Sequence, residues 1–100
     1  MEKKKLVTVY TQPDCRPCRR VIKKLEEAGI ELEVVDLSKD LLAKDYVQRV
    51  LRVSSTPIVE AFGFPLIVGY QPDKLKEFIH EVRIEQNADE IHDYVYGDEE

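Results

Sequence analysis

The first third of the chain combines short apolar runs with one stretch of helical spacing. Residues 6–10 are rich in β-branched and aromatic side chains and are interrupted only by Thr8, a pattern typical of a strand buried on both faces. From Pro17 onward apolar residues recur every three or four positions, and Gly29 follows them as a C-terminal cap, which predicts a helix. Residues 30–37 predict a second strand. Because a helix connects the two strands, we expect them to run parallel.

The middle of the chain predicts a second helix. Ser38 or Asp40 is expected to cap it, and it extends over about residues 41–51. Its buried face is predicted from four residues at helical spacing: Leu42, Tyr46, Val47 and Val50. The helix is expected to stop near residues 53–55.

The last part of the pattern predicts a hairpin followed by a helix. Residues 56–61 and 65–68 are apolar runs separated by residues 62–64, a spacing that suits two antiparallel strands. Pro72 suits the first turn of a helix. The apolar face of that helix contains Leu75, Phe78, Ile79 and Val82. The order of elements is therefore strand, helix, strand, helix, strand, strand, helix, which is an α/β arrangement.

Length and charge narrow the range of functions. One hundred residues suit a single domain, which we assign to residues 1–86, followed by a flexible acidic tail over residues 87–100. The formal charge of −5 argues against binding to nucleic acid or to an anionic membrane surface. The charge is unevenly distributed, since residues 1–30 carry eight Lys/Arg against four Asp/Glu and residues 81–100 carry one against eight. No apolar run reaches the length of a membrane span, so a cytoplasmic location is expected.

The strongest chemical motif is Cys15-Arg16-Pro17-Cys18 at the start of the first predicted helix. A helix N-terminus carries unpaired N–H groups and a partial positive charge, so it stabilises a thiolate. Cys15 is the favoured nucleophile, and Cys18, one turn further along, would be the shielded partner that resolves a mixed disulfide. Neighbouring charges act in both directions, because three arginines (Arg16, Arg19 and Arg20) favour the thiolate and Asp14 disfavours it.

A structural zinc site is the alternative interpretation of the two cysteines. Zinc normally takes four ligands, and the remaining candidates are His80 and His92, which are far apart in sequence. This spacing does not match a zinc motif, so we expect no metal. His80 is more simply a polar position on the last helix, and His92 a residue of the acidic tail.

Ser55-Thr56-Pro57 opens the third predicted strand and has two interpretations. A proline at this position is commonly just the entry residue of a strand. The functional interpretation is a cis peptide bond facing the cysteines, which leaves the Thr56 backbone free to pair with a bound substrate strand.

Three motifs together resemble the glutaredoxin-like NrdH-redoxins, the small dithiol electron donors of class Ib ribonucleotide reductase. The motifs are residues 10–18, Thr56-Pro57 and residues 69–73, which read Gly-Tyr-Gln-Pro-Asp. The similarity extends from about residue 6 to residue 82. It implies a thioredoxin fold, in which a four-stranded mixed sheet is flanked by three helices.

The resemblance also implies roles and partners. Cys15 would attack, Cys18 would resolve, and the bond before Pro57 would be cis. Contacts to substrate are expected from six residues: Arg16, Pro17, Thr56, Pro57, Gly69 and Tyr70. Electrons would come from thioredoxin reductase and NADPH and pass to ribonucleotide reductase or another disulfide protein. No bound cofactor is expected beyond the redox-active disulfide, and the polar outer faces suggest a monomer.

Two departures from the resemblance bear on the choice of reductant. Glutaredoxins often carry a lysine where Gln12 stands, and glutathione-dependent members tend to have Gly-Gly where this chain has Gly69-Tyr70. Both changes weaken a glutathione-dependent reaction and favour thioredoxin reductase. A glutathione-dependent glutaredoxin is thus the second function considered. A third is a non-catalytic binding protein of the same fold, which would hold a partner through Thr56, Pro57 and the acidic tail.

Overall fold

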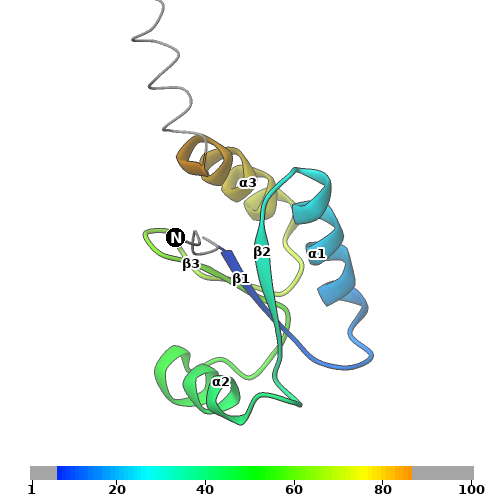
Figure 1. Cartoon of the computed structure of the whole chain (residues 1–100), viewed down its shortest axis with the longest axis vertical. Coiled ribbons are helices and arrows are strands. Elements are labelled where there is room, and N and C mark those ends of the chain that lie inside the picture. The colour runs from blue at the N-terminus through cyan, green and yellow to red at the C-terminus, as the bar shows by residue number, and fades with distance from the viewer. Residues whose placement is uncertain (1–6, 87–100) are drawn as a thin grey trace, which may run out of the picture.

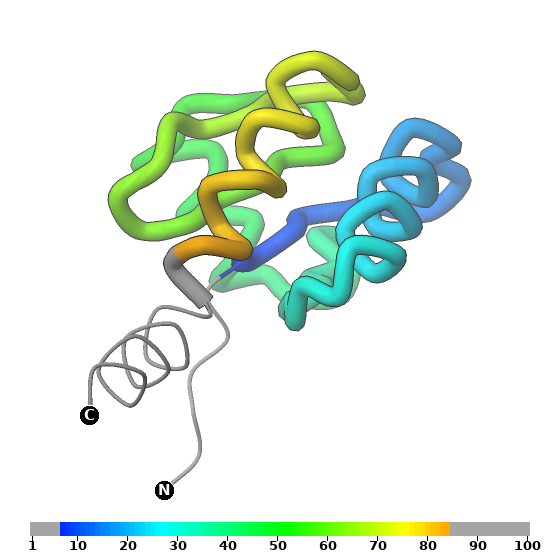
Figure 2. The backbone as a smooth tube through the Cα atoms, turned by 90° about the horizontal axis from the view of Figure 1, so that it is seen from above, coloured from blue at the N-terminus to red at the C-terminus, as the bar shows by residue number. Residues whose placement is uncertain are grey.

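The computed structural model describes residues 7–86, which form a four-stranded sheet with helices on both faces (Figures 1 and 2). The elements are β1 (Val7–Thr11), α1 (Arg16–Glu27), β2 (Leu32–Asp36), α2 (Leu41–Tyr46), η1 (Val47–Leu51), β3 (Ile58–Ala61), β4 (Ile67–Val68) and α3 (Pro72–Gln86). This is the predicted order, with η1 continuing α2, and the thioredoxin-like α/β fold is confirmed. The predicted acidic tail and the lysine-rich start lie outside the described residues.

The sheet has the order β2-β1-β3-β4. β1 pairs with β2 in parallel, as expected for two strands connected by a helix, and it pairs with β3 in antiparallel orientation. β3 and β4 are also antiparallel, and Gly63 in the turn before β4 has a φ of 85°, a conformation that glycine adopts without steric cost. The predicted parallel pair and hairpin are both confirmed. The carboxyl ends of β1 and β2 therefore lie at the same end of the sheet (Figure 1).

The helix ends follow the predicted signals, and the structure decides between Ser38 and Asp40 as the cap of the second helix. Asp40 caps α2, because its Oδ1 accepts a hydrogen bond from the Ala43 N–H at 3.0 Å. Ser38 instead donates its hydroxyl to Asp36 Oδ1 at 2.6 Å. Gly29 follows α1 with a φ of 77°, which agrees with its predicted capping position.

The buried face predicted for the second helix is wrong at two of its four residues. Leu42 is 85% exposed and Val50 is 64% exposed. Val47 is buried and Tyr46 packs beside it, as predicted, but Ala43 takes the inward position in place of Leu42, which lies about 100° around the helix axis. After Tyr46 the chain continues as the π-helix η1, whose wider turn includes an extra residue, so Leu51 packs inward in place of Val50.

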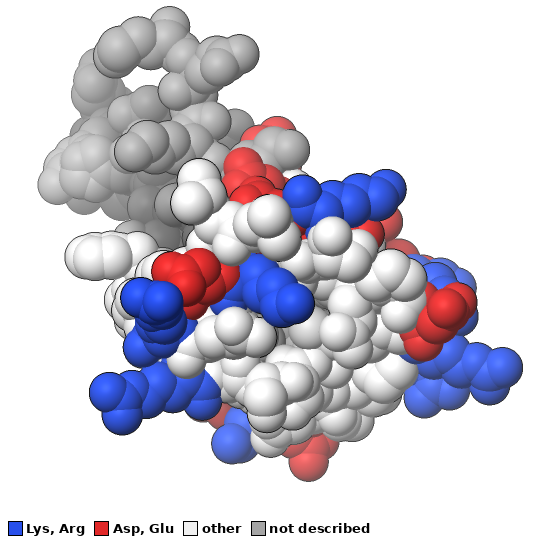
Figure 3. Space-filling view, turned by 90° about the horizontal axis from the view of Figure 1, so that it is seen from below, with Lys and Arg blue, Asp and Glu red and all other residues white. Residues whose placement is uncertain are grey.

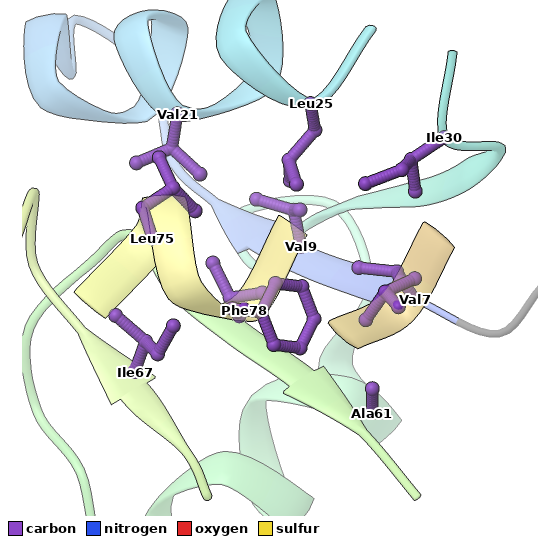
Figure 4. Packing of buried hydrophobic residues seen from close by; sticks show 11 residues of the cluster. Val7, Val9, Val21, Leu25, Ile30, Ala61, Ile67, Leu75 and Phe78 are labelled. Carbon is purple, nitrogen blue, oxygen red and sulfur yellow. The ribbon is translucent and has the colours of Figure 1, made fainter. Parts of the chain in front are cut away.

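Two apolar layers hold the sheet between the helices. Figure 4 shows the larger layer, in which side chains of α1 and α3 meet those of β1, β3 and β4. Its buried members are Val7, Val9, Val21, Leu25, Ile30, Val59, Ala61, Ile67, Leu75, Phe78 and Val82. The opposite face of the sheet packs against α2 and η1 around Tyr10, Val47 and Ile58. The predicted apolar face of the last helix is confirmed by this packing. No helix within residues 7–86 is both long enough and apolar enough to cross a membrane.

Candidate active site

Cys15 lies between β1 and α1, at the end of the sheet where the parallel strands β1 and β2 both have their carboxyl ends. Figure 1 shows the loop that joins β1 to α1. The preceding residue, Asp14, has a φ of 59°, a left-handed conformation that aspartate adopts more readily than most residues. Cys15 itself is extended and is the N-cap of α1, and Pro17 lies in the first turn, where its missing N–H costs no helical hydrogen bond. The local sequence therefore directs the sulfur to the N-terminus of a helix.

Cys15 and Cys18 form a disulfide with Cα atoms 5.2 Å apart, so the structure presents the oxidised form of the pair. The two residues differ in access, since Cys15 is 9% exposed and Cys18 is 1% exposed. A macromolecular partner approaching this end of the molecule therefore reaches Cys15 first.

Two donors point to the sulfur of Cys15. The N–H of Cys18 donates to Cys15 Sγ at 3.2 Å, and the hydroxyl of Thr56 donates to the same atom at 3.6 Å. The first turn of α1 contains no acidic residue. These groups and the helix dipole all favour negative charge on Sγ once the disulfide is reduced.

The Thr56-Pro57 peptide bond is cis, as the resemblance implies. Pro57 is buried directly before β3, and its carbonyl accepts a hydrogen bond from the Gly69 N–H at 2.8 Å. Gly69 has a φ of 81°, a conformation that glycine adopts without steric cost, and with it the chain after β4 turns close to Pro57. No residue in the described part of the chain hydrogen bonds to the main chain of Thr56, whose side chain contacts Cys15 and which is only partly buried.

Of the remaining expected contact residues, Arg16 and Pro17 are exposed beside Cys15. Tyr70 is half-buried and packs partly against the larger apolar layer. The guanidinium of Arg20 lies over the Tyr70 ring, 5.9 Å from its centroid. The fold thus brings all six expected contact residues and both cysteines to one end of the molecule. Thr56 contacts Cys15, and the hydrogen bond from Gly69 to Pro57 places Gly69 and Tyr70 next to Thr56.

A pocket beside Thr56 was not predicted from the sequence. It has a volume of about 230 Å³ and extends from the loop after β1 to α2 and η1. Its lining combines apolar side chains with polar ones, among them Gln12, Lys44, Gln48, Ser54 and Ser55. The sequence holds one weak signal, because Lys44 and Gln48 are four residues apart on the predicted helix and so share a face. Figure 3 shows the molecule from below, with a largely uncharged area that has both Lys/Arg and Asp/Glu side chains around it.

A second feature missed by the sequence pattern is a carboxylate between two tyrosines. Tyr10 and Tyr46 both donate their hydroxyls to Glu60, the first at 2.7 Å. Burial and the hydrogen bond to Glu60 raise the pKa of Tyr10 well above its ordinary value, and the hydrogen bond to Glu60 raises the pKa of Tyr46. This network connects β1, α2 and β3 beneath the pocket side of the sheet.

Metal ligands do not gather near the cysteines. Within residues 7–86 no three His, Cys, Asp or Glu side chains come together in a way that could hold a metal ion. His80 is exposed on α3, and His92 lies outside the described residues. The zinc interpretation therefore gains no ligand set here.

Comparison with known proteins agrees with this geometry. The glutaredoxin family profile matches residues 7–63, which include β1, the cysteine pair, the cis proline and β3. The chain belongs to the glutaredoxin family. Its Cys15–Cys18 pair is accordingly the active-site disulfide of a thiol-disulfide redox protein.

Phage and prophage proteins are among the similar sequences. The chain is 52% identical over 73 residues to the Gene 56 protein of Mycobacterium phage D29, which covers 73% of this chain and 81% of that protein. It is 32% identical over 76 residues to the SPbeta prophage-derived thioredoxin-like protein YosR of Bacillus subtilis, covering 72% of this chain and 91% of that protein.

Solved structures of thioredoxin-like proteins superpose on the same region. The thioredoxin-like protein BC3987 has a TM-score of 0.66 at 35% identity, covering 71% of this chain and 96% of that structure. The NrdH-redoxin of Escherichia coli has a TM-score of 0.64 at 25% identity, covering 71% of this chain and 91% of that structure. NrdH-redoxin is thus a distant structural neighbour within a broader set of glutaredoxin-like and thioredoxin-like proteins.

Proposed function

We propose that this chain is a dithiol electron carrier that takes electrons from thioredoxin reductase and NADPH and reduces a protein disulfide, in the first place that of a ribonucleotide reductase. The observation that carries the proposal is the position of Cys15: a sulfur at a helix N-terminus, with two hydrogen-bond donors and an unpaired Thr56 main chain beside it.

The first step is attack on the target. In the reduced protein the Cys15 thiolate attacks one sulfur of the target disulfide, a new S–S bond forms to Cys15, and the other target sulfur leaves as a thiolate that takes a proton. The free N–H and C=O of Thr56 support this step, because they can pair with the target chain as an added strand and align its disulfide with Cys15.

The second step releases the product. The Cys18 sulfur, as a thiolate, attacks Cys15 Sγ, the Cys15–Cys18 disulfide re-forms, and the second target sulfur leaves and is protonated. Two electrons thus move from the dithiol to the target. The low exposure of Cys18 supports this division of roles, since external disulfides reach Cys15 before they reach Cys18.

The choice of reductant is supported by Tyr70 and Gln12. The Tyr70 ring, covered by the Arg20 guanidinium, stands beside Gly69 where a second glycine would leave the groove open. Gln12 is exposed and uncharged, so it offers no cation to a carboxylate of glutathione. The solved NrdH-redoxin is itself described as a glutaredoxin-like protein with a thioredoxin-like activity profile.

Glutathione dependence is the second candidate, and the pocket beside Thr56 favours it. That pocket is partly polar and adjoins the residue that contacts Cys15, and its lining contains one cation, Lys44, and no carboxylate. A small anionic peptide would meet complementary charge there.

The deciding experiment measures NADPH consumption with a protein disulfide substrate under two electron sources. One assay contains thioredoxin reductase, and the other contains glutathione and glutathione reductase. We expect NADPH consumption in the assay with thioredoxin reductase and none in the assay with glutathione. The opposite result would support the second candidate, a glutathione-dependent glutaredoxin. Cys15→Ser serves as the control in both assays and should abolish disulfide reduction, since it removes the attacking sulfur. Reduction at the unaltered rate by this variant would overturn the mechanism itself.

A further inference from the structure

The outer face of α1 carries an uncompensated positive charge that begins at the active site. The first acidic residue of this helix is Glu26, near its C-terminal end. Before it the helix has five cationic side chains: Arg16, Arg19, Arg20, Lys23 and Lys24. All five are exposed. Within residues 7–86 the ion pair found is Arg49 with Asp45 on the opposite side of the sheet, so none of the five has a carboxylate partner there.

This charge continues across a groove onto α3. A cavity of about 270 Å³ lies between the two helices, lined by Lys24, Tyr70, Pro72, Asp73, Leu75, Lys76 and Ile79. Its lining thus contains two lysines and a single carboxylate, and Arg20 lies over the ring of Tyr70, one of the lining residues. We call the five α1 cations together with Lys76 the basic face.

The basic face is continuous with the reacting sulfur. Gly69, next to Tyr70, is hydrogen bonded to the carbonyl of Pro57, and Thr56 reaches Cys15. A polypeptide aligned on Thr56 with its disulfide at Cys15 would therefore extend past Tyr70 onto the groove. An extended strand spans about 3.3 Å per residue, so a few residues on one side of the target disulfide are sufficient to reach it.

We propose that the basic face docks an acidic segment of the disulfide protein that this chain reduces, so that carboxylates close to the target disulfide raise the rate of its reduction. The proposal rests on the proposed function. A short acidic segment fits better than nucleic acid, because the whole chain has a formal charge of −5 and would repel a long polyanion beyond the limits of one helix. The chemistry at the sulfurs is unchanged; the charges act on encounter and alignment.

The test uses the full chain, reduced beforehand and freed of reductant, with two synthetic peptides. Both contain the same Cys-x-x-Cys disulfide, flanked on one side by glutamates in one peptide and by glutamines in the other. The second-order rate of reduction is expected to be about tenfold higher for the glutamate peptide at about 10 mM salt, and nearly equal for both at about 1 M salt, where screening is short-ranged. Equal rates at low salt would overturn the inference. No reaction with either peptide would instead overturn the proposed function, so the two failures are distinguishable.

A pair of variants assigns the preference to this surface. Lys24→Glu with Lys76→Glu reverses two charges in the groove, away from Cys15, and is expected to remove most of the preference for the glutamate peptide. Lys39→Glu with Lys74→Glu makes the same change in net charge at exposed positions outside the basic face and should preserve the ratio of the two rates. Loss of the ratio in both variants would show an effect of net charge alone and would contradict the proposal.

The acidic end of the chain is the competing occupant. A third variant replaces its carboxylates by amides while keeping the full length, at Asp89, Glu90, Asp93, Asp98, Glu99 and Glu100. The proposal expects the preference for the glutamate peptide to be the same with and without these charges. If the preference for the glutamate peptide is found only in this amide variant, the chain's own acidic segment occupies the basic face in the unaltered protein. That result would overturn docking of the target.

Discussion

Thr56 illustrates how much of the site depends on single side chains. Its hydroxyl donates to Cys15 Sγ, and its main chain is unpaired by any described residue, so one residue contacts the sulfur and also offers the main-chain groups that the proposed function assigns to substrate binding. The sequence could mark Thr56 because of the proline that follows it. The hydrogen bond to Cys15 could not be read from the sequence, since it joins residues 41 positions apart.

The variant Thr56→Val tests the side-chain role alone. Valine keeps the shape and β-branching of threonine but removes the donor, so the Cys15 thiolate loses one of its two hydrogen bonds. Because a hydrogen bond to a charged group contributes about 1.5–3 kcal/mol at good geometry and less at this longer distance, we expect alkylation of reduced Cys15 by iodoacetamide near pH 7 to slow severalfold. Thr56→Ser keeps the hydroxyl and should stay close to the unaltered rate. If the valine and serine variants react equally fast, the hydroxyl does not stabilise the thiolate.

At the scale of elements, Glu60 holds β3 to β1 and α2 through Tyr10 and Tyr46. Burial and this hydrogen bond raise the pKa of Tyr10 above its ordinary value. A raised pKa means that the folded state keeps its proton while the unfolded state loses it. The stabilising contribution is therefore complete below about pH 10 and declines as the pH rises from there toward the folded value.

Tyr10→Phe is the variant that tests this network. It removes the titrating hydroxyl and keeps the ring in the core around Val47 and Ile58. A single titrating group changes the unfolding free energy by at most ~1.4 kcal/mol per pH unit. Above about pH 10 we therefore expect the unfolding free energy to fall more steeply for the unaltered chain than for the variant, with a difference in slope of up to this value. Urea denaturation at pH 8 and at about pH 10.5 measures the difference. Parallel losses in both proteins would mean that Tyr10 does not titrate with folding.

The elements also show where sequence patterns succeed and fail. The cap of α1, the positions of the strands and the apolar face of α3 follow from local spacing and from Gly and Pro signals, and the structure has them as predicted. The predicted face of the second helix is wrong at Leu42, where the neighbouring Ala43 packs inward, and at Val50, where the π-helix η1 changes the number of residues per turn. The Glu60 network, the pocket beside Thr56 and the groove at Tyr70 combine residues from several elements, so periodicity within one element carries no signal for them.

At the scale of the whole molecule, stability and chemistry are separated in space. The larger apolar layer lies between the sheet and the helices α1 and α3 (Figure 4), whereas the reacting sulfur stands at the end of β1, at the N-terminus of α1. α1 serves both, since its inward side supplies Val21 and Leu25 to the core and its first turn surrounds Cys15. Core packing at Leu25 therefore fixes the helix on whose N-terminus the sulfur depends.

Two leucine truncations test this division. Leu25 is fully buried in the larger layer, so Leu25→Ala removes apolar contacts and leaves a cavity, and we expect a loss of about 2–5 kcal/mol in unfolding free energy. This is a large share of the ~5–15 kcal/mol typical of a domain. Leu42, predicted from spacing to be buried, is 85% exposed, so the matched change Leu42→Ala should fall within about 0.5 kcal/mol of the unaltered chain. Urea denaturation of the oxidised proteins measures both. A loss at Leu42 comparable to that at Leu25 would restore the face predicted from the sequence and contradict the orientation of α2 described above.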